Sequence, residues 1–213
     1  MSGLELIDVS NPSAPVSQGS YFTEGYAIDV DAAGAFAYVI DTPGGLSVID
    51  LSQAGDLDPT GIQGVREPSA AISVTNFRSP DGRDITLAGL MSANSGLELF
   101  DVSNPSTPTS VGTYRDPGRP QTTFIGAAAT VGYVRVQMHE SRAFLADVYP
   151  PFELQAIDVS DPTAPSLVTT FSPPGSPRDI AVSGDLVLLA VGPTPGAATN
   201  TPSPGVLILR LKS

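Results

Sequence analysis

GLELIDVSNPSAP at residues 3–15 returns as GLELFDVSNPSTP at residues 96–108, with 11 of 13 positions identical. A third copy, ELQAIDVSDPTAP, occupies residues 153–165, a looser one, GLSVIDLSQAGDL, residues 45–57, and a clipped one, GVLILRLKS, residues 205–213. The aspartates that mark the first four copies are spaced 42, 51 and 57 residues apart. A period of this length is typical of a blade of four short strands, so the repeat decides the architecture.

Each copy reads as a strand followed by a sharp stop. Leu4 and Leu6 fall on one face of an extended chain, and Ile7 and Val9 fall on the other. A strand that is apolar on both faces is buried on both sides, as when a blade is packed between two neighbours. The Asn-Pro or Asp-Pro that follows ends the strand, because proline cannot donate to a ladder.

A hairpin of two apolar strands around a polar turn lies between successive copies, at residues 25–41, 71–89, 132–147 and 178–191. We name the strands of a blade A to D from the centre outward, so that the hairpin supplies A and B, the repeated motif is C, and the segment after the proline is D. This order predicts seventeen strands.

The sequence therefore predicts an all-β protein, a single β-propeller over residues 1–213 with four-stranded antiparallel blades, of which about four are present. The chain begins and ends on strand C, so we expect an arc rather than a closed ring, cut from a larger parent of six to eight blades. The predicted blades cover residues 1–22 (partial), 25–65, 68–114, 118–171 and 176–213 (partial).

The composition argues against several classes of function. The formal charge of −12 disfavours nucleic acid and anionic membranes as partners. No apolar run is long enough for a membrane span, and the chain starts without a signal peptide. Without cysteine, and with Lys212 and His139 as the only residues of their types, thiol sites, a Walker A loop and an H-E-x-x-H zinc site are excluded.

The repeated motif, together with the preceding strands Ala37–Asp41 (AYVID) and Ala143–Asp147 (AFLAD), resembles the LVIVD-repeat family over nearly the whole chain. The resemblance implies a β-propeller of a bacterial or archaeal exported or cell-surface protein, in a family mostly without assigned activity. Residues 45–57, which lack the Asn-Pro stop, and the insertion at 115–131 depart from the motif.

The aspartate that closes strand C recurs as Asp8, Asp50, Asp101 and Asp158. These carboxylates are either a ring of metal ligands or structural acceptors for backbone N–H groups of the turn. Recurrence in every blade favours the structural role, because an active site needs asymmetry.

Two other polar patterns are weaker. His139, Glu140 and Ser141 could support acid-base chemistry, but they fill a hairpin turn on the side away from the usual propeller site, where a solvent-facing role is expected. For calcium we considered the pair Asp29 and Asp31, the pair Asp56 and Asp58, and the turn at 81–84. None matches an EF-hand loop, so we expect no cofactor, with Ca²⁺ as the alternative.

The best candidate site is inferred from the geometry of a propeller. In a propeller the D-to-A and B-to-C loops share one face around the channel, and exposed charges there suit a protein or carbohydrate ligand. The loops and strand ends of that face carry Glu24, Asp41, Arg66, Glu67, Arg115, Arg119, Asp147 and Arg178.

Two functions remain open. The first is a non-enzymatic propeller scaffold that acts as a surface or secreted binding module. The second is a propeller hydrolase or lyase that uses channel-facing carboxylates and a metal, with Asp41, Asp147 and Glu24 as its first candidates. Convergence of these carboxylates near the axis would favour the enzyme.

Overall fold

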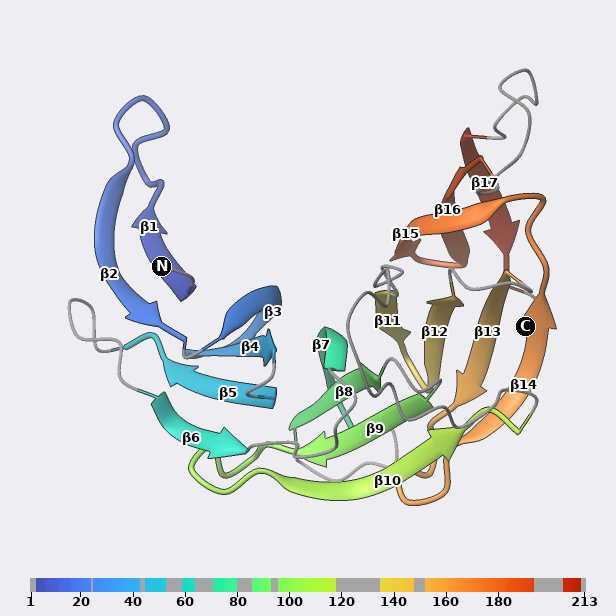
Figure 1. Cartoon of the computed structure of the whole chain (residues 1–213), viewed down its shortest axis with the longest axis horizontal. Coiled ribbons are helices and arrows are strands. Elements are labelled where there is room, and N and C mark those ends of the chain that lie inside the picture. Colours follow the sequence, from blue (N-terminus) through green and yellow to red (C-terminus); the bar gives the residue numbers. More distant parts are fainter. Residues whose placement is uncertain are drawn as a thin grey trace.

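The computed structural model describes residues 3–23, 25–42, 45–52, 59–63, 71–79, 86–92, 96–117, 135–147, 152–193 and 205–211. Within these residues the chain forms seventeen strands and no helix, as the repeat predicts. The strands make five antiparallel sheets arranged side by side along an open arc (Figure 1).

The first two blades lie in the N-terminal half of the arc. Blade 1 has two strands, β1 (Gly3–Asp8) and β2 (Val16–Phe22). Blade 2 has four, β3 (Tyr26–Ala33), β4 (Phe36–Thr42), β5 (Gly45–Asp50) and β6 (Pro59–Gln63).

Blade 3 has β7 (Ala71–Arg78), β8 (Thr86–Ser92), β9 (Gly96–Asp101) and β10 (Thr109–Arg115). Blade 4 has β11 (Arg135–His139), β12 (Arg142–Asp147), β13 (Glu153–Asp158) and β14 (Ser166–Phe171). Blade 5 has β15 (Ser176–Ser183), β16 (Leu186–Gly192) and β17 (Gly205–Arg210).

The A strands β3, β7, β11 and β15 follow one another along the inside of the arc, where each contacts the next. The ring is not closed: among the described strands, β17 pairs with β16 alone and β2 pairs with β1 alone. The arc expected from the strand count is therefore present in the structure (Figure 1).

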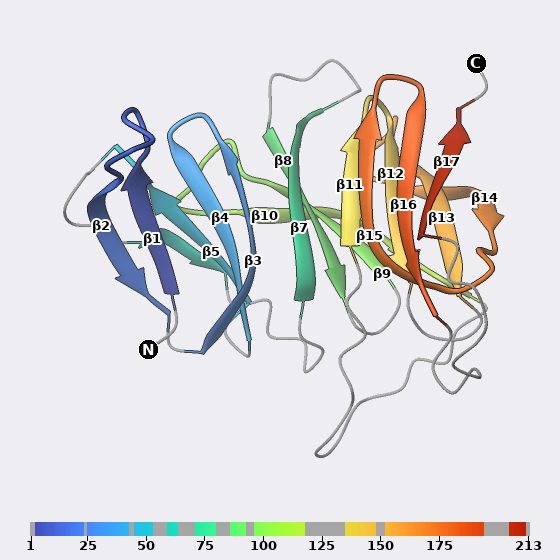
Figure 2. The ribbon, with the colours of Figure 1, turned by 90° about the horizontal axis from the view of Figure 1, so that it is seen from above.

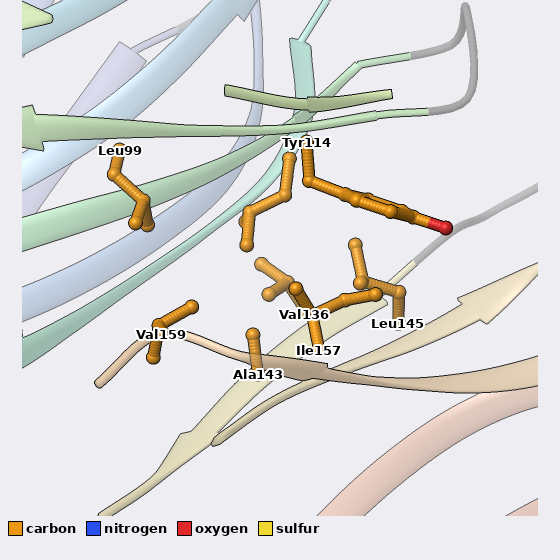
Figure 3. Packing of buried hydrophobic residues seen from close by; sticks show 8 residues of the cluster. Leu99, Tyr114, Val136, Ala143, Leu145, Ile157 and Val159 are labelled. Atoms are coloured by element: carbon orange, nitrogen blue, oxygen red, sulfur yellow. The ribbon is translucent and has the colours of Figure 1, made fainter. Parts of the chain in front are cut away.

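The C strands supply the core between blades because both of their faces are apolar. In blade 3, Leu97 and Leu99 pack toward blade 4, whereas Phe100 and Val102 pack toward blade 2. Figure 3 shows the contact between blades 3 and 4, where Leu99 and Tyr114 meet a group of aliphatic side chains from blade 4. That group contains Val136, Ala143, Leu145, Ile157 and Val159.

Bulges recur at fixed places in the blades. Each of the four C–D pairs has a register shift near the end of strand C, as between Ser110 and Gly112 of β10. Three of the four A–B pairs have another, as between Ala27 and Asp29 of β3. A bulge bends and twists its strand, which suits the curvature of a blade.

Candidate functional site

The two faces of the arc are formed by different parts of the blades. The A–B turns of blades 2, 4 and 5 lie on one face (Figure 2), which we call the turn face. The ends of the B and D strands and the start of the C strands lie on the opposite face, which we call the loop face. The predicted ligand-binding residues belong to the loop face.

A polar cluster joins blades 3 and 4 on the loop face. Gln155 of β13 is buried, and its side-chain amide donates hydrogen bonds to Asp116 Oδ2 at 2.6 Å and to Glu153 Oε2 at 3.3 Å. Asp116 follows β10 directly, and Glu153 begins β13. One amide group therefore holds two carboxylates from neighbouring blades together.

Tyr114 lies next to this cluster, at the edge of the apolar core. Its ring packs among the core side chains, and its hydroxyl group points out of them (Figure 3). The hydroxyl oxygen is buried and has no hydrogen-bond partner in the described part of the chain. Burial raises the pKa of Tyr114, and the negative charges of Asp116 and Glu153 raise it further. The phenol therefore stays protonated and can donate a hydrogen bond.

Two of the predicted loop-face residues lie on the strands that form this cluster. Arg115 is the last residue of β10 and is exposed. Asp147 is the last residue of β12; it is buried and lies opposite Glu153 in the ladder. We name Tyr114, Asp116, Asp147, Glu153 and Gln155 the blade 3–4 cluster; Arg115 borders it in the sequence, but its side chain lies on the opposite face of β10 from that of Tyr114.

The other predicted loop-face residues lie elsewhere. Arg178 is exposed in β15 of blade 5, where its side chain lies against Gly192. Asp41 is the next-to-last residue of β4 in blade 2; it is buried, and its Oδ2 accepts a hydrogen bond from Gly25 N at 3.1 Å. Asp41 Oδ1 has no hydrogen-bond partner among the described residues. Glu24, Arg66, Glu67 and Arg119 fall outside the described residues.

The carboxylates named for the enzyme alternative are distributed over the arc. Asp41 belongs to blade 2 and Asp147 to blade 4, with the whole of blade 3 between them. In the described part of the chain, no group of three or more His, Cys, Asp or Glu side chains is arranged to hold a metal ion. Asp56, Asp58 and the turn at 81–84, considered for calcium, lie outside the described residues.

A second polar network crosses the A strands. Asp29 of β3 accepts a hydrogen bond from Val74 N of β7 at 2.9 Å and another from Arg135 Nη1 of β11 at 3.0 Å. Arg135 Nε also lies 3.5 Å from Asp179 Oδ1 of β15. Asp31 accepts a bond from Ala32 N at 2.9 Å. The network links blades 2, 3, 4 and 5.

The repeated aspartates each receive a hydrogen bond from the backbone N–H two residues later. Oδ1 accepts from Ser10 N, Ser52 N, Ser103 N and Ser160 N at 2.8–2.9 Å in Asp8, Asp50, Asp101 and Asp158, respectively. The N–H and hydroxyl groups of the serine lower the pKa of Asp8 and Asp158, with the N–H as the larger cause. For Asp50 the hydroxyl of Ser52 is the larger cause of the lowered pKa. In each case the carboxylate accepts from the backbone two residues on, which is the hydrogen bond of an Asx turn.

The turn face carries an open groove of about 530 Å³ between blades 4 and 5. It is lined by His139, Glu140, Ser141, Arg142, Gly184, Asp185 and Leu211. His139 is half-buried and ends β11, whereas the sequence placed it in a solvent-facing turn. Glu140 has φ 52°, the conformation that glycine adopts at the equivalent turns, with φ 61° at Gly34 and 55° at Gly184.

Sequence reasoning missed both polar networks. Asp29, Arg135 and Asp179 each stand five residues before the residue with positive φ in their hairpins, so aligning the hairpins on their turns would have found them. No alignment of this kind would have related Gln155 to Asp116. That contact depends on how two blades pack against each other.

Comparison with known proteins supports the repeat and the fold. The LVIVD repeat profile matches residues 1–23, 24–57, 92–116 and 143–172. No curated protein matches the chain significantly.

Three solved structures share the fold at low sequence identity. The computationally designed Ika4 protein has TM-score 0.56 and 7% identity, over 90% of this chain and 94% of its own. The designed Ika8 protein has TM-score 0.55 and 10% identity, over 82% of this chain and 46% of its own. The N-terminal domain of Nup159 has TM-score 0.51 and 10% identity, over 93% of this chain and 48% of its own.

The chain thus spans about half the length of two of these structures, and at such identities the likeness shows the fold alone.

In the described residues there is no helix that is long and apolar enough to cross a membrane. The family profile covers more than half of the sequence, and each of its four matches contains one C strand, β1, β5, β9 or β13. The chain belongs to the LVIVD-repeat family of β-propeller proteins.

Proposed function

We propose that this propeller is a non-enzymatic binding module of an exported or cell-surface protein, and that its loop face binds a polar protein or carbohydrate ligand. The observation that carries the proposal is the blade 3–4 cluster. There the buried amide of Gln155 holds Asp116 and Glu153 beside the hydroxyl of Tyr114.

The chemistry of this cluster suits recognition. Binding sites use a few precisely held polar groups to fix the orientation of a ligand. Gln155 is buried and bonded to both carboxylates, so the acceptors are oriented before any ligand arrives. Arg115 adds an exposed donor at the same strand end, and its guanidinium presents several N–H groups in a rigid fork. A hydroxyl-rich or peptide ligand offers the complementary donors and acceptors.

The test compares the two faces of the arc on the full chain. Wild type, Arg115→Ala and Asp116→Asn are applied to glycan arrays and to arrays of immobilised extracellular protein domains. Asp185→Asn, on the turn face, is the matched control for a lost carboxylate. We expect the ligands bound by wild type to be lost, by about tenfold or more in affinity, in the two loop-face variants and retained in the control.

Two results would contradict the proposal. One is that wild type binds no array component. The other is that Asp185→Asn weakens binding as much as Arg115→Ala does, which would move the ligand to the turn face.

A further inference from the structure

The contact between blades 3 and 4 can be compared with the contact between blades 4 and 5, because equivalent positions follow from the strand registers. Tyr114 and Phe171 hold the same place in their D strands, each opposite the second residue of its C strand. The third residue of the following C strand is Gln155 at the first contact and Leu207 at the second. The polar groups between blades 3 and 4 are therefore a departure from the repeat, whereas parts that serve the scaffold recur from blade to blade.

The hydroxyl group of Tyr114 is not explained by packing. Phe171 shows that the ring alone serves at this place in the fold. Tyr114 is 7% exposed, and its hydroxyl oxygen is buried without a hydrogen-bond partner in the described part of the chain. Because an unsatisfied buried polar group is costly, this hydroxyl indicates a partner from outside the chain.

The same hydroxyl lies beside two carboxylates. Burial raises the pKa of Tyr114, and the charges of Asp116 and Glu153 raise it further, so both carboxylates are close enough to act on the phenol. The ring leaves the apolar core with its hydroxyl pointing outward (Figure 3). Oxygen atoms from blades 3 and 4 thus gather at one point of the loop face.

The cluster is rich in hydrogen-bond acceptors. Nε2 of Gln155 lies 2.6 Å from Asp116 Oδ2 and 3.3 Å from Glu153 Oε2, so an N–H donor fits between the two carboxylates. Each ionised carboxylate offers about four lone-pair sites, and the phenol oxygen also accepts. The cluster can therefore receive further N–H groups, and its negative charge favours a cation as their source.

We propose that the blade 3–4 cluster binds the ammonium group of a lysine side chain of a partner protein. The inference rests on the binding function proposed above for the loop face, and it specifies the partner. A lysine ammonium is compact and carries three N–H donors, one for each oxygen supplied by Asp116, Glu153 and Tyr114. The planar fork of an arginine instead matches a single carboxylate.

The burial of the hydroxyl favours lysine over an amino sugar. A group that reaches the end of the Tyr114 ring must be slender, because that oxygen lies below the surface. Lysine carries its charge at the end of a flexible four-carbon stem. An amino sugar carries the ammonium directly on its ring, and the ring would have to enter with it. The formal charge of −12 also attracts a basic protein to this chain.

The experiment titrates the ¹⁵N-labelled full chain with the end-blocked pentapeptide GGKGG, up to about 10 mM, above a millimolar dissociation constant. NMR spectra give the affinity and show which backbone amides shift. Matched peptides carry Nε-acetyl-lysine, which lacks the charge, or arginine in place of lysine. Tyr114→Phe removes the hydroxyl and leaves the charge of the cluster unchanged. Tyr26→Phe is the matched control, because Tyr26 is 73% exposed on β3.

We expect the lysine peptide to shift the amides of Asp116, Glu153 and Gln155 and to bind about tenfold more tightly than either matched peptide. Tyr114→Phe should weaken this binding about tenfold, and Tyr26→Phe by less than about twofold. Without peptide, Tyr114→Phe should melt at a temperature no lower than wild type, since its hydroxyl has no partner to lose. A purely structural hydroxyl would give the opposite pair of results.

Four outcomes would overturn the lysine assignment. They are equal affinity for lysine and acetyl-lysine, unchanged binding by Tyr114→Phe, amide shifts confined to other blades, and tighter binding of a glucosamine oligosaccharide. If one of them occurs while Arg115→Ala and Asp116→Asn still lose the array ligands, the loop-face function stands and the lysine assignment alone fails. If wild type binds neither an array component nor the lysine peptide, both proposals fail.

Discussion

Asp101 illustrates what one side chain contributes to the turn that follows strand C. Its Oδ1 accepts hydrogen bonds from Ser103 N at 2.9 Å and from the Ser103 hydroxyl at 2.7 Å. The turn continues with Asn104, whose Oδ1 accepts from Ser106 N at 3.2 Å. Short polar side chains thus satisfy the backbone where the chain leaves the sheet, which is why this motif tolerates so little variation between copies.

Replacing Asp101 with alanine should lower the free energy of unfolding by about 1–2 kcal/mol, because the Ser103 N–H loses its acceptor. Urea unfolding measures the change. Asp101→Asn is the control, since it keeps an acceptor oxygen and should recover most of the loss. We also expect calcium to leave the melting temperature of wild type unchanged. A calcium-dependent rise that Asp101→Ala removes would make this carboxylate a metal ligand instead.

Asp158 predicts a pH dependence. The Ser160 N–H and hydroxyl stabilise the carboxylate and lower its pKa in the folded protein below its ordinary value of 3.8. A lowered folded pKa means that the stabilisation is present above the unfolded pKa and is lost as the pH falls through the folded pKa. The stability advantage of wild type over Asp158→Asn should therefore be constant from pH 7 to about 5 and shrink below about pH 4. An advantage that persists unchanged to pH 2.5 would contradict the assignment.

At the scale of a strand, Gly112 shows how closely neighbouring blades approach. It follows the bulge of β10, and a Cβ atom there would come within 2.0 Å of the Pro162 carbonyl oxygen of blade 4. The D strand of blade 3 therefore passes directly beneath the turn that follows strand C of blade 4. No side chain fits between two backbones at this distance.

Gly112→Ala should destabilise the protein by about 1–3 kcal/mol, because the backbone of one blade must shift to admit the methyl group. Thr113→Ala, at the next and exposed position of the same strand, should change stability by no more than about 0.5 kcal/mol. Chemical unfolding of both variants makes the comparison. Equal effects would mean that the close approach does not constrain the fold.

The strands were predictable, and the reason lies in the repeat. The segments after the proline, which the sequence predicts as D strands, are β2 (Val16–Phe22) and β10 (Thr109–Arg115) in blades 1 and 3. Apolar residues on both faces, ended by Asn-Pro, specify a buried strand and its end without reference to the rest of the chain. The bulges were not predictable, because one extra residue such as Val111 in the strand TSVGTYR does not change the local pattern enough to be recognised.

The candidate site was only partly predictable. Arg115 and Asp147 could be assigned to the loop face because they end strands, and strand order determines which end faces the loops. The bond from Gln155 to Asp116 could not be inferred, because it joins residues 39 positions apart in different blades. Its existence depends on the twist and spacing of whole sheets, which no local pattern encodes.

For the whole molecule, the hydrogen bond between Asp29 and Arg135 is a contact between blades that are not neighbours. It joins side chains 106 residues apart, from blades that have blade 3 between them. The Asp29 side chain is only 10% exposed, so its charge is shielded from water and needs its partners.

A double-mutant cycle with Asp29→Asn and Arg135→Met should give a coupling energy of about 1–2 kcal/mol for this pair. The matched control is the exposed pair of Arg210 and Asp185 on blade 5, for which the coupling should be below about 1 kcal/mol because solvent screens it. Thermal and urea unfolding of the single and double variants give both values. A coupling for Asp29 and Arg135 no larger than that of the control would show that the link contributes little.

The link has a consequence for how the arc loses its structure. In a linear array of repeats, each repeat contacts only its immediate neighbours, so the terminal repeats can unfold while the central repeats stay folded. The hydrogen bond between Asp29 and Arg135 joins blades 2 and 4, which are not neighbours, so this chain is not a purely nearest-neighbour array. We expect unfolding of blade 3 to break this bond as well. Hydrogen exchange should therefore report blades 2 to 4 as one cooperative block, flanked by the earlier opening of blades 1 and 5.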